Sequence, residues 1–227
     1  MMTYIPSGED EIQFLKGYDA TKYQNPGFAA DTALFAVSDH ALQLLLIKRG
    51  SYPYKGCWAL PGGFVDIDED ITVAADRELM EETGLSGLYL EQVFTWGRPD
   101  RDPRYRTITA SHVAMADASA LKPVAGDDAA EAGWFTLSNY TITESGGETR
   151  ISYTLRGCEE LHPVVAFPTG QMQKIYPIDS AGLAFDHAES IAYSYEYLKK
   201  RAQEGFLDLT FDDEAIKAHA GRLLLGK

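Results

Sequence analysis

The chain has 227 residues, 45% hydrophobic and 24% charged, a composition typical of a globular protein with a sizeable core and not of a disordered or fibrous chain. Its formal charge of −14 argues against binding a polyanion such as nucleic acid unless basic residues gather locally. No apolar run approaches the ~20 residues that span a bilayer, and the acidic amino terminus shows no secretory signal, so we expect a cytoplasmic protein without membrane contact.

The first 137 residues predict a main α/β domain. A short helix is expected over residues 11–18, followed by an irregular connector. Apolar, β-compatible runs predict strands at 32–37, 41–47, 58–60, 88–96, 107–115 and 133–137. A helix without internal glycine or proline is expected over 71–82, and Gly84 suits the left-handed position beyond its end. The predicted fold is therefore a mixed β-sheet sandwiched between helices.

The remaining residues differ in pattern. Residues 138–181 predict an inserted β-rich segment, with a hairpin turn at 145–147 and strands at 150–155, 164–167 and 172–176. This segment could serve as a substrate lid or as a dimer interface. Residues 182–227 predict a helical carboxy-terminal segment, with helices at 183–201 and 212–225.

One turn of the helix over 71–82 is rich in carboxylates. Glu78, Glu81 and Glu82 lie within about 100° of one another on a helical wheel, because neighbours at i+3 and i+4 share a face. A cation would relieve their mutual repulsion, and the small side chains of Ala74 and Ala75 on the same side leave room for it. Ligands that are all oxygen suit Mg²⁺ or Mn²⁺ rather than zinc. For a glutamate-rich turn by itself, a solvated helix face is the alternative.

The carboxylates belong to a longer pattern that closely resembles the Nudix box, whose seven fixed positions are filled by Gly63, Glu69, Arg77, Glu78, Glu81, Glu82 and Gly84. Seven fixed identities over this length give on the order of 10⁻⁶ accidental matches. The resemblance implies a Nudix fold and a divalent-metal hydrolase that splits the diphosphate of a nucleoside-diphosphate substrate.

The same resemblance implies roles for single residues. Glu78 and Glu82 are the expected principal metal ligands, Glu81 assists them, and the Gly63 carbonyl contributes. Arg77 is expected to be structural and to pair with a loop carboxylate such as Glu69.

The general base in this superfamily often lies on a later loop. The candidates here are Asp127, Asp128 and Glu131. For Glu131, a role at the end of a loop is an equal alternative.

A basic segment follows the box. Arg98, Arg101, Arg104 and Arg106 form the local patch that an anionic substrate would need in an acidic protein. The segment resembles its counterpart in ADP-ribose pyrophosphatases and in Nudix-related regulators that sense ADP-ribose, which implies an ADP-ribose-like substrate. The alternative is a surface loop whose arginines pair with the aspartates at 100 and 102.

Two other functions stay open. The first is an ADP-ribose-sensing regulator with a DNA-binding winged helix, which the intact box opposes, as do the eight acidic and six basic residues of 186–227. The second is a Nudix hydrolase of another nucleotide diphosphate, since loops select the leaving groups. We also expect a homodimer. Of the histidines, His112 is expected in the core, and His187 at the surface or as a helix cap.

Overall fold

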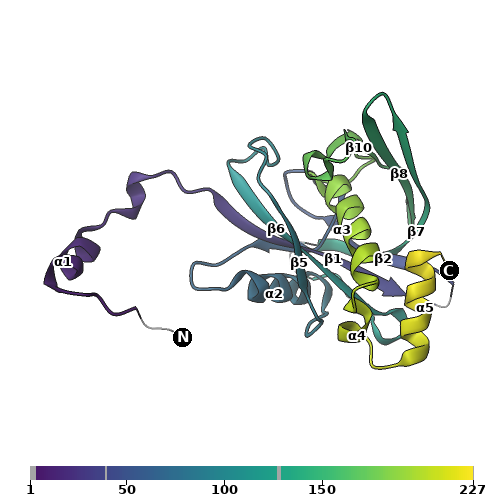
Figure 1. The fold of residues 1–227 in the computed structure, drawn as a ribbon, viewed down its shortest axis with the longest axis horizontal. Helices are drawn as coiled ribbons and strands as arrows, with labels where there is room; N and C mark the ends of the chain where they lie inside the picture. Colours follow the sequence, from purple (N-terminus) through teal and green to yellow (C-terminus); the bar gives the residue numbers. More distant parts are fainter. Residues whose placement is uncertain (1–3, 39, 127–128, 227) are drawn as a thin grey trace.

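The computed structural model describes residues 4–38, 40–126 and 129–226 and is built on one mixed sheet of 11 strands (Figure 1). The main path runs β11-β10-β8-β7-β2-β1-β6-β5, with β3 on β2, β4 on β1 and β9 on β8. The strands are β1 (Gly27–Val37), β2 (Leu42–Arg49), β3 (Trp58–Ala59), β4 (Gly62–Phe64), β5 (Glu91–Trp96), β6 (Thr107–Asp117), β7 (Ala129–Ser145), β8 (Glu148–Arg156), β9 (Glu160–Leu161), β10 (Val164–Pro168) and β11 (Tyr176–Asp179).

Helices cover both faces of this sheet. The α-helices are α1 (Glu9–Gly17), α2 (Ile71–Thr83), α3 (His187–Ala202), α4 (Phe206–Thr210) and α5 (Glu214–Leu225). Alternate residues of a strand point to opposite faces, and those of β1 divide accordingly. Phe35 packs in the core beneath α3, α4 and α5, whereas Leu34 packs with Leu79 of α2 on the other face. The predicted α/β class is confirmed.

The centre of the sheet positions the two segments that the sequence assigned to the site, the glycines of β4 and the loop of residues 97–106. β1 and β6 pair in parallel from Gly27 opposite Thr107 to Val37 opposite Asp117. β4 pairs with β1 at the same end, where Ala30 faces Gly63. The loop of residues 97–106 also leads into β6 at this end. The glycines of β4 and the basic segment therefore meet at the same end of β1 and β6.

The amino-terminal arm, residues 4–26, extends away from the sheet (Figure 1). Its helix α1 has no buried residue, and the arm exposes the large apolar side chains Tyr4, Ile5, Phe14, Leu15, Tyr18 and Tyr23.

Three expectations about elements need correction. Residues 172–176 are not a strand but begin with the 3-10 helix Met172–Lys174, and the strand follows as β11. The helix expected over 183–201 begins only at His187, and the short helix α4 was not predicted. The boundary expected at 137 falls inside β7, which pairs with β8 on both sides of it, so residues 138–181 extend the sheet.

No helix in the described part of the chain is long and apolar enough to span a bilayer. Cys57 and Cys158 are free thiols.

Candidate active site

Helix α2 has clear signals at both ends. The side chain of Asp70 caps it by accepting a hydrogen bond from the Thr72 backbone N–H at 3.0 Å. Gly84 ends it in the left-handed conformation, φ 73°, which glycine adopts without steric cost. The helix packs against β1 and β4 through the buried Ala74, Ala75 and Leu79, so its last two turns face the glycine turn, Gly62–Gly63, with which β4 begins.

Glu82 is the most buried of the three box glutamates. It is 6% exposed, and its Oε2 accepts a hydrogen bond from the Gly62 N–H at 2.9 Å. Burial, with a smaller contribution from the negative charges of Glu78 and Asp31, outweighs the hydrogen bond from Gly62 and raises the pKa of Glu82 to about 8. Glu82 is thus a desolvated carboxylate among other carboxylates.

Glu78 lies against the same turn. A Cβ added to Gly63 would come within 2.5 Å of the Glu78 carboxylate, so any other residue at 63 would displace this side chain from its position. Glu81 is exposed on the next face of the helix.

Arg77 joins the glutamates to the loop. Its guanidinium donates to both carboxylate oxygens of Glu69 at 2.8 Å and to the Phe64 carbonyl at 3.0 Å. Nη1 also donates to Glu78 at 2.7 Å and to Glu81 at 3.0 Å. The expected structural pair of Arg77 with Glu69 is confirmed, and it fixes the loop over the helix.

This carboxylate set fits a divalent cation. Among the described residues, three ligating side chains do not converge on one point, because Arg77 holds Glu78 and Glu81. Even so, burial above all, and after it the negative charges of Glu78 and Asp31, raises the pKa of Glu82, and a cation would stabilise its ionised form. The donors are carboxylates and the backbone of a glycine turn, all oxygen, as hard cations prefer.

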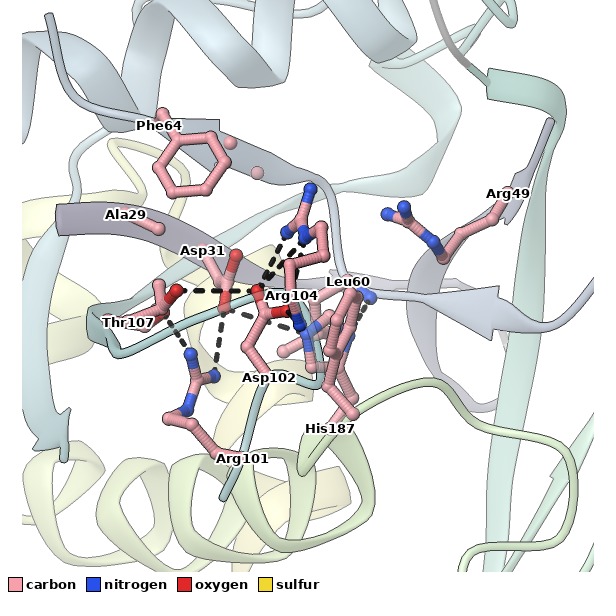
Figure 2. A pocket seen from close by; sticks show the side chains of 14 residues that line it. Ala29, Asp31, Arg49, Leu60, Phe64, Arg101, Asp102, Arg104, Thr107 and His187 are labelled. Carbon is pink, nitrogen blue, oxygen red and sulfur yellow. Dashed lines mark hydrogen bonds and ion pairs between the residues drawn. The ribbon is translucent and has the colours of Figure 1, made fainter. Parts of the chain in front are cut away.

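A pocket opens beside the glycine turn (Figure 2). The empty space in and above it is about 410 Å³, open solvent at the mouth included, and residues from six parts of the chain line it: Ala29, Asp31, Arg49, Leu60, Gly62, Gly63, Phe64, Arg101, Asp102, Arg104, Thr107, Thr109, Phe185 and His187. Figure 2 shows Arg104 and Asp102 together, with Phe64 on one side and Arg49 on another. Cations and aromatic rings therefore lie next to the box loop.

The structure brings two of the four predicted arginines to this pocket. Arg104 pairs with Asp102 at 2.8 Å, and its guanidinium lies over the ring of Phe64 at 5.1 Å. Arg101 is buried and donates to both oxygens of Asp186, at 2.8 and 2.6 Å, so its charge is already neutralised.

The other two arginines lie elsewhere. Arg98 pairs with Asp100 at 3.0 Å and with Glu189 at 3.5 Å. Arg106 lines a shallow depression beside residues 24–26 of the arm. The alternative in which the arginines pair with the aspartates at 100 and 102 therefore describes Arg98 and Arg104 in part. Arg101 pairs instead with Asp186, a partner that the sequence did not suggest.

The candidate bases are not in the described part of the site. Asp127 and Asp128 lie outside the described residues. Glu131, on β7, is exposed, with Lys48 Nζ at 3.9 Å, and it does not line the pocket. A catalytic role for any of them stays a prediction.

Sequence reasoning missed several pocket residues. Asp31 is a carboxylate within the apolar run of β1, and Arg49 ends β2, so both were visible as charges at the edges of predicted strands. Phe185 and His187 come from the turn before α3 and carried no such signal. His187 was expected at the surface or as a helix cap; it is the first residue of α3 but is buried, and its Nδ1 accepts a hydrogen bond from the Leu60 N–H at 2.8 Å. His112 is buried, as expected.

The mixed sheet with helices on both faces, and the glutamate-rich helix that packs against the Gly62–Gly63 segment beside a pocket, define the class as an α/β protein. The NUDIX domain model matches residues 28–155, and the chain belongs to the Nudix family.

Named relatives include both enzymes and regulators. The chain is 39% identical over 130 residues to an ADP-ribose pyrophosphatase of Methanocaldococcus jannaschii, covering 56% of this chain and 73% of that one. It is 44% identical over 107 residues to an ADPR responsive transcriptional repressor of Acinetobacter baylyi, covering 46% of this chain. The match spans 43% of the repressor's length.

Solved structures agree with the fold. A MutT/nudix family protein from Enterococcus faecalis has a TM-score of 0.64 at 28% identity, over 84% of this chain and 69% of that one. The NUDIX domain of Shewanella oneidensis NrtR complexed with ADP ribose has a TM-score of 0.58 at 25% identity, over 83% of this chain and 98% of that one.

Proposed function

We propose that the chain is a divalent-metal pyrophosphohydrolase that cleaves ADP-ribose to AMP and ribose 5-phosphate, with Mg²⁺ or Mn²⁺ as its metal. The observation that carries the proposal is the buried Glu82, held by the Gly62 N–H beside Glu78. Gly62 and Gly63 in turn line a pocket that Arg49, Arg101 and Arg104 also line. A solvated acidic helix face would leave Glu82 exposed. Similarity to a named ADP-ribose pyrophosphatase and to a domain solved with ADP ribose supports the choice of substrate.

The chain's own residues account for binding and orientation. When bound, the metal would neutralise charge on the diphosphate and lower the pKa of an attacking water. Glu78 and Glu82, with the Gly63 carbonyl, would hold it, assisted by Glu81. Arg77 keeps the turn and the helix in register through Glu69 and Phe64.

The pocket's cations suit the substrate's phosphates. Arg104 is 43% exposed at its side chain, and Arg49 reaches the same pocket from the end of β2. A guanidinium binds phosphate oxygens in a fixed fork geometry, which favours a diphosphate over a neutral ligand. Other nucleoside-diphosphate compounds contain the same diphosphate, so the substrate panel below tests which moiety is attached to it.

The test is hydrolysis of a panel of nucleoside-diphosphate compounds with and without Mg²⁺. ADP-ribose should be the best substrate, and a chelator should abolish turnover. Glu78→Gln and Glu82→Gln should each lower kcat by about a thousandfold, since a lost ligand removes several kcal/mol of transition-state stabilisation. Glu144→Gln, an exposed glutamate on β7, is the matched control. Activity that survives chelation would overturn the proposal.

A second candidate is an ADP-ribose-responsive regulator, favoured by the 44% identity to a named repressor. The discriminating assay is an electrophoretic mobility shift with promoter fragments at moderate salt. A salt-sensitive complex that ADP-ribose dissociates would favour this second function. We expect no specific complex, because the net charge is −14 and neutralising the phosphates of a DNA site needs a concentrated basic surface.

We further propose a homodimer. The arm of residues 4–26 exposes six large apolar side chains, and a helix of nine residues such as α1 is marginal in water without a packing partner. Light scattering after size-exclusion chromatography should give twice the 25.1 kDa chain mass. A monomeric mass would remove the proposal.

A further inference from the structure

The turn before α3, together with the first residue of that helix, comprises residues 182–187. It is hydrogen-bonded to β3, the strand that leads into the Leu60–Gly63 loop. The Trp58 N–H donates to the Gly182 carbonyl at 3.1 Å, and the Ala184 N–H donates to the Trp58 carbonyl at 2.8 Å. Trp58 and Leu183 thereby form a parallel bridge between segments more than a hundred residues apart. We call residues 182–187 the α3 lead-in.

His187 extends this attachment from β3 to the loop itself. The Leu60 N–H donates to His187 Nδ1 at 2.8 Å, and both residues are buried. Because Nδ1 accepts, a neutral ring carries its hydrogen on Nε2, which lies 3.6 Å from Asp31 Oδ2. The imidazole therefore accepts from the backbone of the loop through Nδ1, while Nε2 faces the Asp31 carboxylate of β1 from beyond hydrogen-bond distance.

The loop passes that restraint directly to a box glutamate. Thr32 N–H donates to the Pro61 carbonyl at 2.8 Å, and two residues after Leu60 the Gly62 N–H donates to Glu82 at 2.9 Å. A shift of Leu60 would move the Gly62 donor and the Gly63 backbone beside Glu78.

The α3 lead-in is held in place by a buried ion pair, and one of its residues has a strained backbone conformation. Asp186 and Arg101 form a buried bidentate pair that anchors it to the segment of residues 97–106. Phe185 has φ 51°, a left-handed conformation that is strained for a bulky residue and persists only where surrounding contacts enforce it. Such strain often accompanies a positional requirement at a functional site.

We propose that His187 is a positioning residue of the active site, which holds the Leu60–Gly63 loop through its Nδ1 so that Gly62 and Gly63 meet Glu82 and Glu78 correctly. The inference rests on the proposed function for its kinetic consequence but not for its structural one. Misplacing a catalytic arrangement by about 1 Å costs about a hundredfold in rate, and residues that orient metal ligands affect metal affinity by about tenfold to a hundredfold.

The test compares variants that keep one side of the imidazole at a time. In His187→Asn the amide oxygen lies near the position of Nδ1 and still accepts from Leu60. In His187→Gln the amide reaches toward Asp31 instead, and the Leu60 acceptor is lost while most of the volume is kept. His219→Ala is the matched control, because His219 is likewise hydrogen-bonded to the backbone, in its case to the Ser38 carbonyl, but lies on α5 away from the pocket.

Relative to the unmodified protein, His187→Gln should lower kcat for ADP-ribose by about tenfold to a hundredfold with KM changed less than about threefold. Its affinity for Mn²⁺, measured by calorimetry, should fall about tenfold. His187→Asn should recover most of both, and His219→Ala should change neither. Equal behaviour of the Asn and Gln variants would overturn the proposal, because a packing role does not distinguish which ring nitrogen is replaced.

A readout without substrate separates this proposal from the proposed function. Amide hydrogen exchange of Leu60 and Gly62 should accelerate in His187→Gln and stay slow in His187→Asn and His219→Ala. If the unmodified protein hydrolyses no diphosphate, the function fails, yet exchange and Mn²⁺ affinity still decide the role of His187. Unchanged exchange at both amides in His187→Gln would refute it.

Discussion

Replacing Gly63 by alanine should damage catalysis while leaving the fold intact. The new Cβ would come within 2.5 Å of the Glu78 carboxylate, and an ordinary contact begins at 3.4 Å, so the carboxylate must retreat by about 1 Å. The Glu78 carboxylate is the flexible end of its side chain, and Gly63 has no left-handed φ. The backbone at Gly63 therefore need not move to accept alanine. A displacement of this size in a metal ligand should lower kcat about a hundredfold, whereas the melting temperature should change little.

Two other glycines make the comparison sharp. At Gly62, φ is 154° and an added Cβ would collide with the Ala30 carbonyl and Asp31, so Gly62→Ala should destabilise the fold by about 2 to 5 kcal/mol. At Gly133, a Cβ would meet nothing closer than Phe135 at 4.0 Å, and Gly133→Ala should be neutral. Steady-state kinetics and thermal melts on the three variants measure both effects. A kcat within threefold of normal in Gly63→Ala would refute the proposed placement of Glu78.

Three further outcomes are expected. Arg101→Ala should lower the free energy of unfolding by about 3 to 5 kcal/mol, because it leaves Asp186 charged, buried and unpaired; a fully stable variant in urea titration would contradict this. Arg104→Ala should raise KM for ADP-ribose about tenfold, since one charge-assisted hydrogen bond contributes about 1.5 to 3 kcal/mol. It should lower the melting temperature less than Arg101→Ala does, because the buried Asp102 keeps the backbone N–H of residue 104 and the Thr107 hydroxyl as donors. Burial and the charge of Asp186 raise the pKa of Glu189 to about 7, so the folded state retains a proton that the unfolded state loses near pH 4.5. The free energy of unfolding should therefore fall by about 3 kcal/mol between pH 5 and pH 8. Glu189→Gln should remove that part of the decline, and an equal decline in the variant and the unmodified protein would contradict this prediction.

Local sequence determined the chemistry of the box. The helix over 71–83, its aspartate cap and its glycine stop depend on contacts within a few residues, and so does the spacing that puts Glu78, Glu81 and Glu82 on one face. The pair of Arg77 with Glu69 spans eight residues and was equally predictable. Alternating and buried apolar runs likewise indicated most strands, because strand burial follows a simple period.

Tertiary structure decided which charges are available to a substrate and which hold the fold together. The sequence showed four arginines in one segment, but the partner of Arg101 is Asp186, 85 residues away, and nothing local distinguishes Arg101 from Arg104. The same holds for His187, whose partner Leu60 is 127 residues distant, and for Asp31, which faces the pocket only because β1 pairs with β4 and β6. Residues 138–181 read as an insertion because their pattern is that of a separate hairpin, yet β7 carries the ladder of the central sheet through residue 137 without a break in the strand. Hydrogen bonds and ion pairs between distant segments depend on the whole packing, and a pattern read along the chain records only the near ones.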